Sequence, residues 1–133
     1  MSEPAAAPER VLIVEDEAAA RVGLEQLIRS WGFIAESACD GEEALEKVTS
    51  FRPAIVITDM VMPNKEGLET VTDLRRDNPK IGILAMSGGH AHDAALYLKL
   101  AGAFGATRML KKPFSLTVLF QTVLEVLNES MNA

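Results

Sequence analysis

The sequence predicts an α/β fold, with a five-stranded, doubly wound parallel sheet covered on both faces by five helices. The main observation is an alternation: short apolar runs are followed by longer stretches in which apolar residues recur at helical spacing. The second is size, because 133 residues fit one domain and 48% hydrophobic residues can fill its core. We therefore expect one compact α/β unit.

Five short apolar segments are the predicted strands. In chain order they are residues 11–14, 33–37, 54–58, 81–86 and 107–111. The helices fill the intervals between them. The first ends at the stop signal Gly32, and Asp40 is the predicted N-cap of the second, at 42–50. The third and fourth are predicted at 66–77 and 93–102. Two sets of apolar residues mark the first and fifth helices: Ala20, Leu24, Leu27, Ile28 and Trp31, then Leu116, Leu119, Val123 and Leu127.

Polar side chains follow four of these strands. Right-handed crossovers bring the carboxyl ends of parallel strands to one edge, outside which ligands bind in such sheets. At this edge we expect Glu15, Asp16, Asp59, Ser87 and Lys112. Clustered carboxylates repel one another unless a divalent cation offsets their charge, and Mg²⁺ prefers hard oxygen ligands. The three acids therefore predict a magnesium site, although a solvated helix start would also account for Glu15 and Asp16.

Composition excludes several functions. The net charge is −6 and no run of Lys and Arg stands out, which argues against binding to nucleic acid or an anionic membrane. Cys39 is the lone cysteine, and no apolar run approaches the roughly 20 residues of a membrane span. The first residues lack a signal-peptide pattern. We expect a cytoplasmic protein with a disordered tail at 1–9, a domain at 10–128 and a short tail at 129–133.

Four motifs agree with one family in order and spacing. They are the run 11–17, Asp59-Met60-Val61-Met62-Pro63 with Gly67, Met86-Ser87-Gly88, and Lys111-Lys112-Pro113-Phe114. Together they resemble the receiver domain of two-component response regulators, and the resemblance runs from Arg10 to about Leu127. It implies a flavodoxin-like sheet with strand order 2-1-3-4-5.

The resemblance also implies a chemistry. Asp59 would accept a phosphoryl group from a phosphohistidine on a sensor histidine kinase or a histidine phosphotransfer protein. Lys112 and Ser87 would contact the phosphoryl oxygens. The implied Mg²⁺ ligands are Asp16, Asp59, the backbone carbonyl of Val61 and, directly or through water, Glu15. Such a domain is not an ordinary enzyme, but it catalyses its own phosphorylation and dephosphorylation at Asp59.

The sequence departs from the family pattern at two places. Met109 stands where relatives carry Tyr or Phe, so switching through an inward-turning ring is in doubt. Gly88 stands where many relatives carry alanine, and Gly89 follows it. These glycines indicate either a loosened start of the fourth helix or a loop that needs positive φ. Of the adjacent lysines, the family pattern selects Lys112, the residue before the proline, and leaves Lys111 on the surface.

Signalling to a partner is the expected output. The few residues after the fifth helix leave no room for a DNA-binding module, so we expect a stand-alone receiver that docks to a target protein or relays its phosphoryl group. The fourth helix is apolar on more than one face, at Leu96, Tyr97, Leu98 and Leu100, which favours a partner or homodimer surface between the fourth and fifth helices.

Other functions fit the sequence less well. A flavodoxin-like cofactor protein needs a phosphate-binding loop where Glu15 and Asp16 stand. A phosphatase with an aspartate nucleophile generally has a second aspartate where Val61 lies. His90 and His92 lack the spacing of metal ligands and are expected to be solvated. The remaining alternative is a degenerate receiver that acts as a phosphorylation-independent interaction module.

Overall fold

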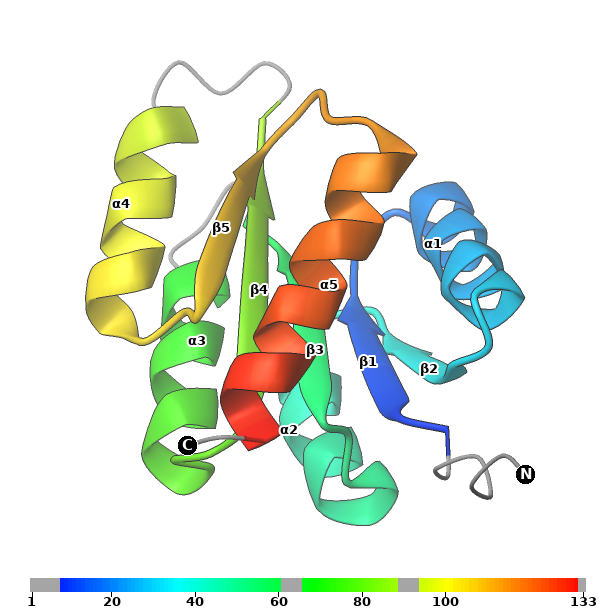
Figure 1. Ribbon diagram of the computed structural model, residues 1–133. Coiled ribbons are helices and arrows are strands. Elements are labelled where there is room, and N and C mark those ends of the chain that lie inside the picture. The colour runs from blue at the N-terminus through cyan, green and yellow to red at the C-terminus, as the bar shows by residue number, and fades with distance from the viewer. Residues whose placement is uncertain (1–7, 61–65, 89–93, 132–133) are drawn as a thin grey trace.

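The computed structural model of the protein describes residues 8–60, 66–88 and 94–131. Strands and helices alternate along the chain (Figure 1). The strands are β1 (Arg10–Val14), β2 (Ile34–Ala38), β3 (Ile55–Asp59), β4 (Gly82–Ser87) and β5 (Arg108–Lys111). The helices are α1 (Ala18–Ser30), α2 (Gly41–Phe51), α3 (Glu66–Asp77), α4 (Ala94–Phe104) and α5 (Leu116–Met131).

All strand pairs are parallel, and the sheet order is β2-β1-β3-β4-β5. The predicted fold class and strand order are therefore confirmed. Strands β1 and β3 lie side by side at the centre, with Val14 opposite Thr58. Because the strand order reverses beside β1, the loops after β1 and β3 open onto the same crevice.

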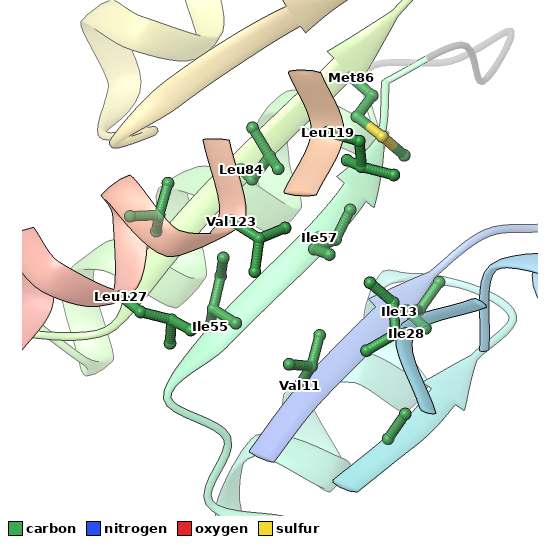
Figure 2. Close-up of a cluster of buried hydrophobic side chains, with 12 residues drawn as sticks. Val11, Ile13, Ile28, Ile55, Ile57, Leu84, Met86, Leu119, Val123 and Leu127 are labelled. Carbon is green, nitrogen blue, oxygen red and sulfur yellow. The ribbon is translucent and has the colours of Figure 1, made fainter. Parts of the chain in front are cut away.

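Side-chain alternation along the strands fills both faces of the sheet. Val11 and Ile13 pack on the face covered by α1 and α5, whereas Leu12 and Val14 pack on the face covered by α2, α3 and α4. Figure 2 shows side chains of α5 over those of the central strands. All the β1 residues from Val11 onward are buried, as expected for a strand covered on both faces.

The helix boundary signals work as predicted. Gly32 follows α1 with φ +94°, a left-handed conformation that favours glycine. Asp40 precedes α2, and its Oδ1 accepts a hydrogen bond from the backbone N–H of Glu43 over 2.8 Å. Both expectations are confirmed.

Most strand boundaries lie one residue later than predicted, and this affects the site. Asp59 and Ser87, expected in the loops after their strands, are the last residues of β3 and β4. Asp59 lies opposite Met86, whose carbonyl accepts a hydrogen bond from Met60, so the ladder continues through the acid. Ser87 is likewise held by its carbonyl, which accepts from Lys112 N–H over 2.7 Å. Main-chain pairing therefore fixes both side chains more firmly than a loop would.

At the opposite edge of the sheet, Arg75 of α3 joins three chain segments. Its guanidinium donates to the carbonyl oxygens of Gly105 over 3.0 Å and Pro79 over 2.8 Å, and to the hydroxyl of Thr107 over 3.3 Å. Gly105 has φ +126°, and an added Cβ there would lie 2.7 Å from Cγ of Arg75. The end of α3 is thus fastened to the turn that follows α4.

Apolar side chains remain exposed on the side of the molecule formed by α4, β5 and α5. They include Leu96, Phe104, Met109, Leu116 and Val118. Leu98 is buried and Leu100 half-buried, so the expected exposure of the fourth helix holds for Leu96 only among these leucines. The side chain of Tyr97 lies outside the described residues. None of the described helices is both long and apolar enough to cross a membrane.

Candidate functional site

Glu15 lies just beyond β1 and is a buried acid, with 4% of its surface exposed. Burial first, and then a hydrogen bond to the carboxyl of Asp59, raise the pKa of Glu15 from its ordinary 4.5 to about 8. A backbone hydrogen bond from the Glu17 N–H, 3.1 Å from Oε2 of Glu15, acts in the opposite direction. Glu15 therefore carries a proton at neutral pH in this arrangement. A carboxylate at a solvated helix start would not have its pKa raised in this way.

Asp59 is buried and forms an ion pair with Lys112. The Lys112 Nζ lies 2.8 Å from Oδ2 of Asp59, and the lysine comes from the loop after β5. Lys111, the preceding residue, is exposed. The structure thus brings to Asp59 the lysine that the motif selects, because residues adjacent in an extended chain point in opposite directions. The peptide bond between Lys112 and Pro113 is cis.

Ser87 is fully buried, and its hydroxyl has no hydrogen-bond partner among the described residues. A buried hydroxyl without a partner is uncommon and costly, and the hydroxyl of Thr58 on β3 is in the same situation. Ser87 is one residue beyond Met86, the ladder partner of Asp59. Ser87 therefore lies at the same edge of the sheet as Asp59.

Gly88 has a packing role that the sequence did not indicate. An added Cβ would lie 2.4 Å from Cβ of Lys112 and 2.9 Å from its carbonyl oxygen. Positive φ occurs at Gly32 and Gly105 among the described glycines, so Gly88 does not supply the positive φ that a loop was expected to need there. Gly89, the second glycine of that expectation, lies outside the described residues. Glycine is needed here because the end of β4 approaches the main chain of Lys112 closely.

Asp16 is exposed beside Glu15 in the three-residue loop between β1 and α1. Arg21, which sequence reasoning missed, reaches back from α1 to this loop. Its Nη1 donates to the carbonyl oxygen of Glu15 over 3.0 Å and to that of Asp16 over 3.4 Å. The only available signal was an arginine five residues after Asp16.

The donor set fits Mg²⁺ in chemical type. Glu15, Asp16 and Asp59 offer hard carboxylate oxygens at one edge of the sheet, and Glu15 hydrogen-bonds both other carboxyls. No group of three or more acidic, His or Cys side chains among the described residues converges in a geometry that could hold a metal. Here a proton on Glu15 and the ammonium of Lys112 offset the charge of the acids. The expected carbonyl ligand of Val61 lies outside the described residues.

Among the other residues singled out from the sequence, the structure describes Met109 but not Gly89 or the two histidines. Met109 of β5 is 40% exposed, and an added Cβ at Gly102 of α4 would lie 2.9 Å from its Cε. The thioether thus packs against α4 without entering the core. Gly89, His90 and His92 lie outside the described residues.

Five parallel strands in this order, with acids after β1, an aspartate ending β3 and a lysine after β5, define the class of receiver-like α/β domains. The family model described as "Response regulator receiver domain" matches residues 11–124. The chain belongs to this family, whose members act in two-component signalling.

Comparisons with individual proteins agree with the family assignment. The chain is 39% identical over 122 residues to the sensor kinase CckA of Brucella abortus, covering 90% of this chain and 12% of the kinase. It is 36% identical over 112 residues to the response regulator MprA of Mycolicibacterium vanbaalenii, covering 84% of this chain and 47% of that protein. The signal receiver domain of a response regulator from Bermanella marisrubri is 29% identical, with a TM-score of 0.80 over 90% of this chain and 98% of that one. The chain thus spans about half or less of the two curated proteins.

Proposed function

We propose that this domain takes a phosphoryl group from a phosphohistidine onto Asp59 and thereby changes the surface that it offers to a partner protein. One observation carries the proposal. The ammonium of Lys112 lies 2.8 Å from Oδ2 of Asp59, at the edge where the Ser87 hydroxyl has no partner among the described residues. A buried carboxylate with a cation and a spare donor beside it suits a nucleophile that receives an anionic group.

The proposed transfer exchanges one bond for another. The bond between phosphorus and the histidine nitrogen breaks, its electron pair stays on the nitrogen, and a bond forms between phosphorus and an Asp59 oxygen. Hydrolysis breaks the new bond between phosphorus and the Asp59 oxygen: water attacks phosphorus, and the Asp59 carboxylate leaves. Catalysis of both steps depends on positioning and on neutralising charge at the phosphoryl oxygens.

Each neighbouring side chain has a proposed task. Lys112 moves its hydrogen bond from the carboxylate to a phosphoryl oxygen, and the Ser87 hydroxyl donates to another. Glu15, Asp16, Asp59 and the Val61 carbonyl would hold Mg²⁺, which when bound offsets the negative charge of the acids and of the phosphoryl group. Glu15 then has to give up its proton, because metal ligands bind in their deprotonated form.

The proposed partners are a sensor histidine kinase or phosphotransfer protein as the cytoplasmic donor, and a downstream target as the receiver of the signal. The exposed apolar residues on α4, β5 and α5 support a docking or dimer surface there. Leu96→Glu should abolish phosphorylation-dependent dimerisation in sedimentation experiments, whereas Val22→Glu, at an equally exposed site on α1, should not. Unchanged dimers of folded Leu96→Glu would remove this face from the proposal.

The phosphoacceptor assignment is tested by intact mass spectrometry. The protein is incubated with acetyl phosphate and Mg²⁺, and wild type is compared with Asp59→Asn, which keeps the shape of the side chain but removes the nucleophile. We expect wild type to gain one phosphoryl group in Mg²⁺ and none in EDTA, and the variant to gain none. A folded wild type that binds Mg²⁺ but gains no phosphoryl group from acetyl phosphate or a kinase would favour the phosphorylation-independent docking module.

A further inference from the structure

Arg21 lies within the first turns of α1, and its guanidinium turns back over the loop that carries the acids. Both of its bonds to this loop go to main-chain oxygens, those of Glu15 and Asp16, and not to the neighbouring carboxylates. The residue is half-buried. An arginine beside several acids that binds the backbone instead of a carboxylate calls for an explanation other than charge pairing.

The two carbonyls belong to the two peptide units on either side of the Asp16 Cα. Each peptide unit is planar, so a hydrogen bond that holds its C=O restrains how the whole plane can turn. With both planes restrained, the range of φ and ψ of Asp16 narrows, and with it the direction of the Cα–Cβ bond. The two hydrogen bonds from Arg21 Nη1 therefore restrain the direction in which the exposed Asp16 carboxylate leaves the chain.

Other bonds hold the same loop from its remaining sides. The N–H of Glu15 donates to the carbonyl of Ala38, at the end of β2, over 3.0 Å. The N–H of Glu17 donates to the Glu15 carboxylate, and the N–H of Arg21 donates to the carbonyl of Glu17 over 2.9 Å. None of these hydrogen bonds uses the carbonyl of Glu15 or of Asp16, and these two carbonyls accept from the Arg21 guanidinium. Removing Arg21 frees the peptide planes on which Asp16 depends.

We propose that Arg21 is a positioning residue for divalent cation binding, which acts by fixing the backbone on both sides of Asp16. The inference rests on the proposed Mg²⁺ site and adds to it a residue that does not touch the metal. Partners that orient metal ligands in this way typically contribute about 10-fold or more to metal affinity.

Charge and geometry predict opposite results, which makes the proposal testable. A guanidinium near the site repels a cation, so if Arg21 acted only through its charge, removing it would strengthen Mg²⁺ binding. If it acts by positioning, removing it weakens binding. Arg21→Gln removes the charge and the long donor, whereas Arg21→Lys keeps the charge on a side chain that is one atom shorter and whose donors are not held in the guanidinium plane.

A matched control lies on the same helix. The Nη2 of Arg29, near the end of α1 remote from the acids, donates to the carbonyl of Ala35 over 2.9 Å and to a carboxylate oxygen of Glu25. Arg29→Gln therefore removes the same charge and a bond of the same kind from the same helix. It controls for changes in net charge and in the stability of α1.

The experiment is calorimetric titration of each full-length variant with MgCl₂, after circular dichroism has established folding. We expect Arg21→Gln to bind Mg²⁺ about 10-fold more weakly than wild type, Arg21→Lys to fall between them, and Arg29→Gln to match wild type. Melting temperatures in EDTA and in Mg²⁺ give a second readout. A merely structural role would lower both equally and leave the Mg²⁺-dependent increase intact, whereas loss of positioning diminishes that increase.

The outcomes separate this inference from the proposed function. Wild type that fails to bind Mg²⁺ removes the metal site itself, and the inference with it. Wild type that binds Mg²⁺ and accepts a phosphoryl group, while both Arg21 variants bind as tightly or more tightly, overturns the inference alone. If Arg21→Gln does not fold, Arg21→Lys decides, since its charge is unchanged and any loss of affinity then reports geometry.

Discussion

The Nζ of Lys112 donates a hydrogen bond to Oδ2 of Asp59 over 2.8 Å, linking the loop after β5 to the end of β3. The lysine is about one-third exposed, whereas the carboxylate is almost completely buried. The ammonium is thus anchored by its bond to the acid but can still swing outward on a flexible stem. This combination suits a group that must follow charge from a carboxylate to a phosphoryl oxygen.

Lys112→Met should slow phosphorylation by acetyl phosphate by about 100-fold, because a charged donor aimed at the transferring group is lost. Mg²⁺ affinity should not fall, since the substitution removes a positive charge from the site. Lys111→Met is the control, because Lys111 is adjacent but exposed. Time-resolved intact mass measures the rate, and calorimetry the affinity. Phosphorylation of Lys112→Met at the wild-type rate would contradict the assigned role.

The raised pKa of Glu15 makes stability depend on pH. Between the ordinary pKa of 4.5 and the folded-state pKa of about 8, the native protein holds a proton that the unfolded chain has released. In EDTA the contribution of Glu15 is therefore complete below about pH 4.5 and disappears as pH rises through about 8, a loss of at most a few kcal/mol. Glu15→Gln should flatten the stability profile across this window.

Urea denaturation at several pH values measures this profile. Glu46→Gln, at an exposed position on α2, serves as the control and should keep the wild-type slope. Parallel profiles for wild type and Glu15→Gln would mean that Glu15 does not hold its proton at neutral pH. Saturating Mg²⁺ should raise wild-type stability most at high pH, where the metal no longer competes with the proton.

Gly88→Ala should destabilise the protein by about 1–3 kcal/mol, because the new methyl group would overlap Cβ and the main chain of Lys112. Gly23→Ala is the matched control. No atom lies within 4 Å of a Cβ added at Gly23, in the middle of α1, so this variant should gain up to about 1 kcal/mol from helix propensity. Urea denaturation of both variants measures the difference. Equal stability of the two would show that the close approach at Gly88 can relax without cost.

Thr58 offers a test of polar burial. Its side chain is fully buried and its hydroxyl has no partner within the described part of the chain, so Thr58→Val should be neutral or stabilise by about 1 kcal/mol. Thr107→Val should destabilise by about 1 kcal/mol or more, because the Thr107 hydroxyl accepts hydrogen bonds from Ile83 N–H and Arg75. Calorimetric melting of both variants compares them. A clear loss of stability in Thr58→Val would reveal a partner for its hydroxyl.

Most of the fold could be predicted from sequence patterns. Strand order follows from short parallel connections and from the family resemblance, and the boundaries came within about one residue because apolar runs end where the ladders end. The one-residue differences arise because Asp59 and Ser87 are polar, so hydrophobicity places them outside strands that main-chain pairing continues through. Polarity placed these residues at the right edge of the sheet but misplaced the end of the strand.

Contacts within the site were less accessible from the sequence. Spacing brought Lys112 to the edge near Asp59, because both positions are tied to strand ends. The proton shared around Glu15 depends on burial, which no local pattern reports. Arg21 was missed because its hydrogen bonds go to backbone carbonyls, which no charge pattern reports. Gly88 was singled out only as a departure from the family pattern, because a missing side chain gives no sign of what it packs against.

The hydrogen bonds that Arg75 of α3 makes to neighbouring chain segments have a mechanical consequence for α4. Because the guanidinium ties the end of α3 to the carbonyl of Gly105, the turn after α4 is clamped to the rigid edge of the sheet. The beginning of α4 instead follows the strand that ends at Ser87. A helix clamped at its far end moves as a lever about that end, so a small displacement near Ser87 would tilt α4 rather than slide it along its axis.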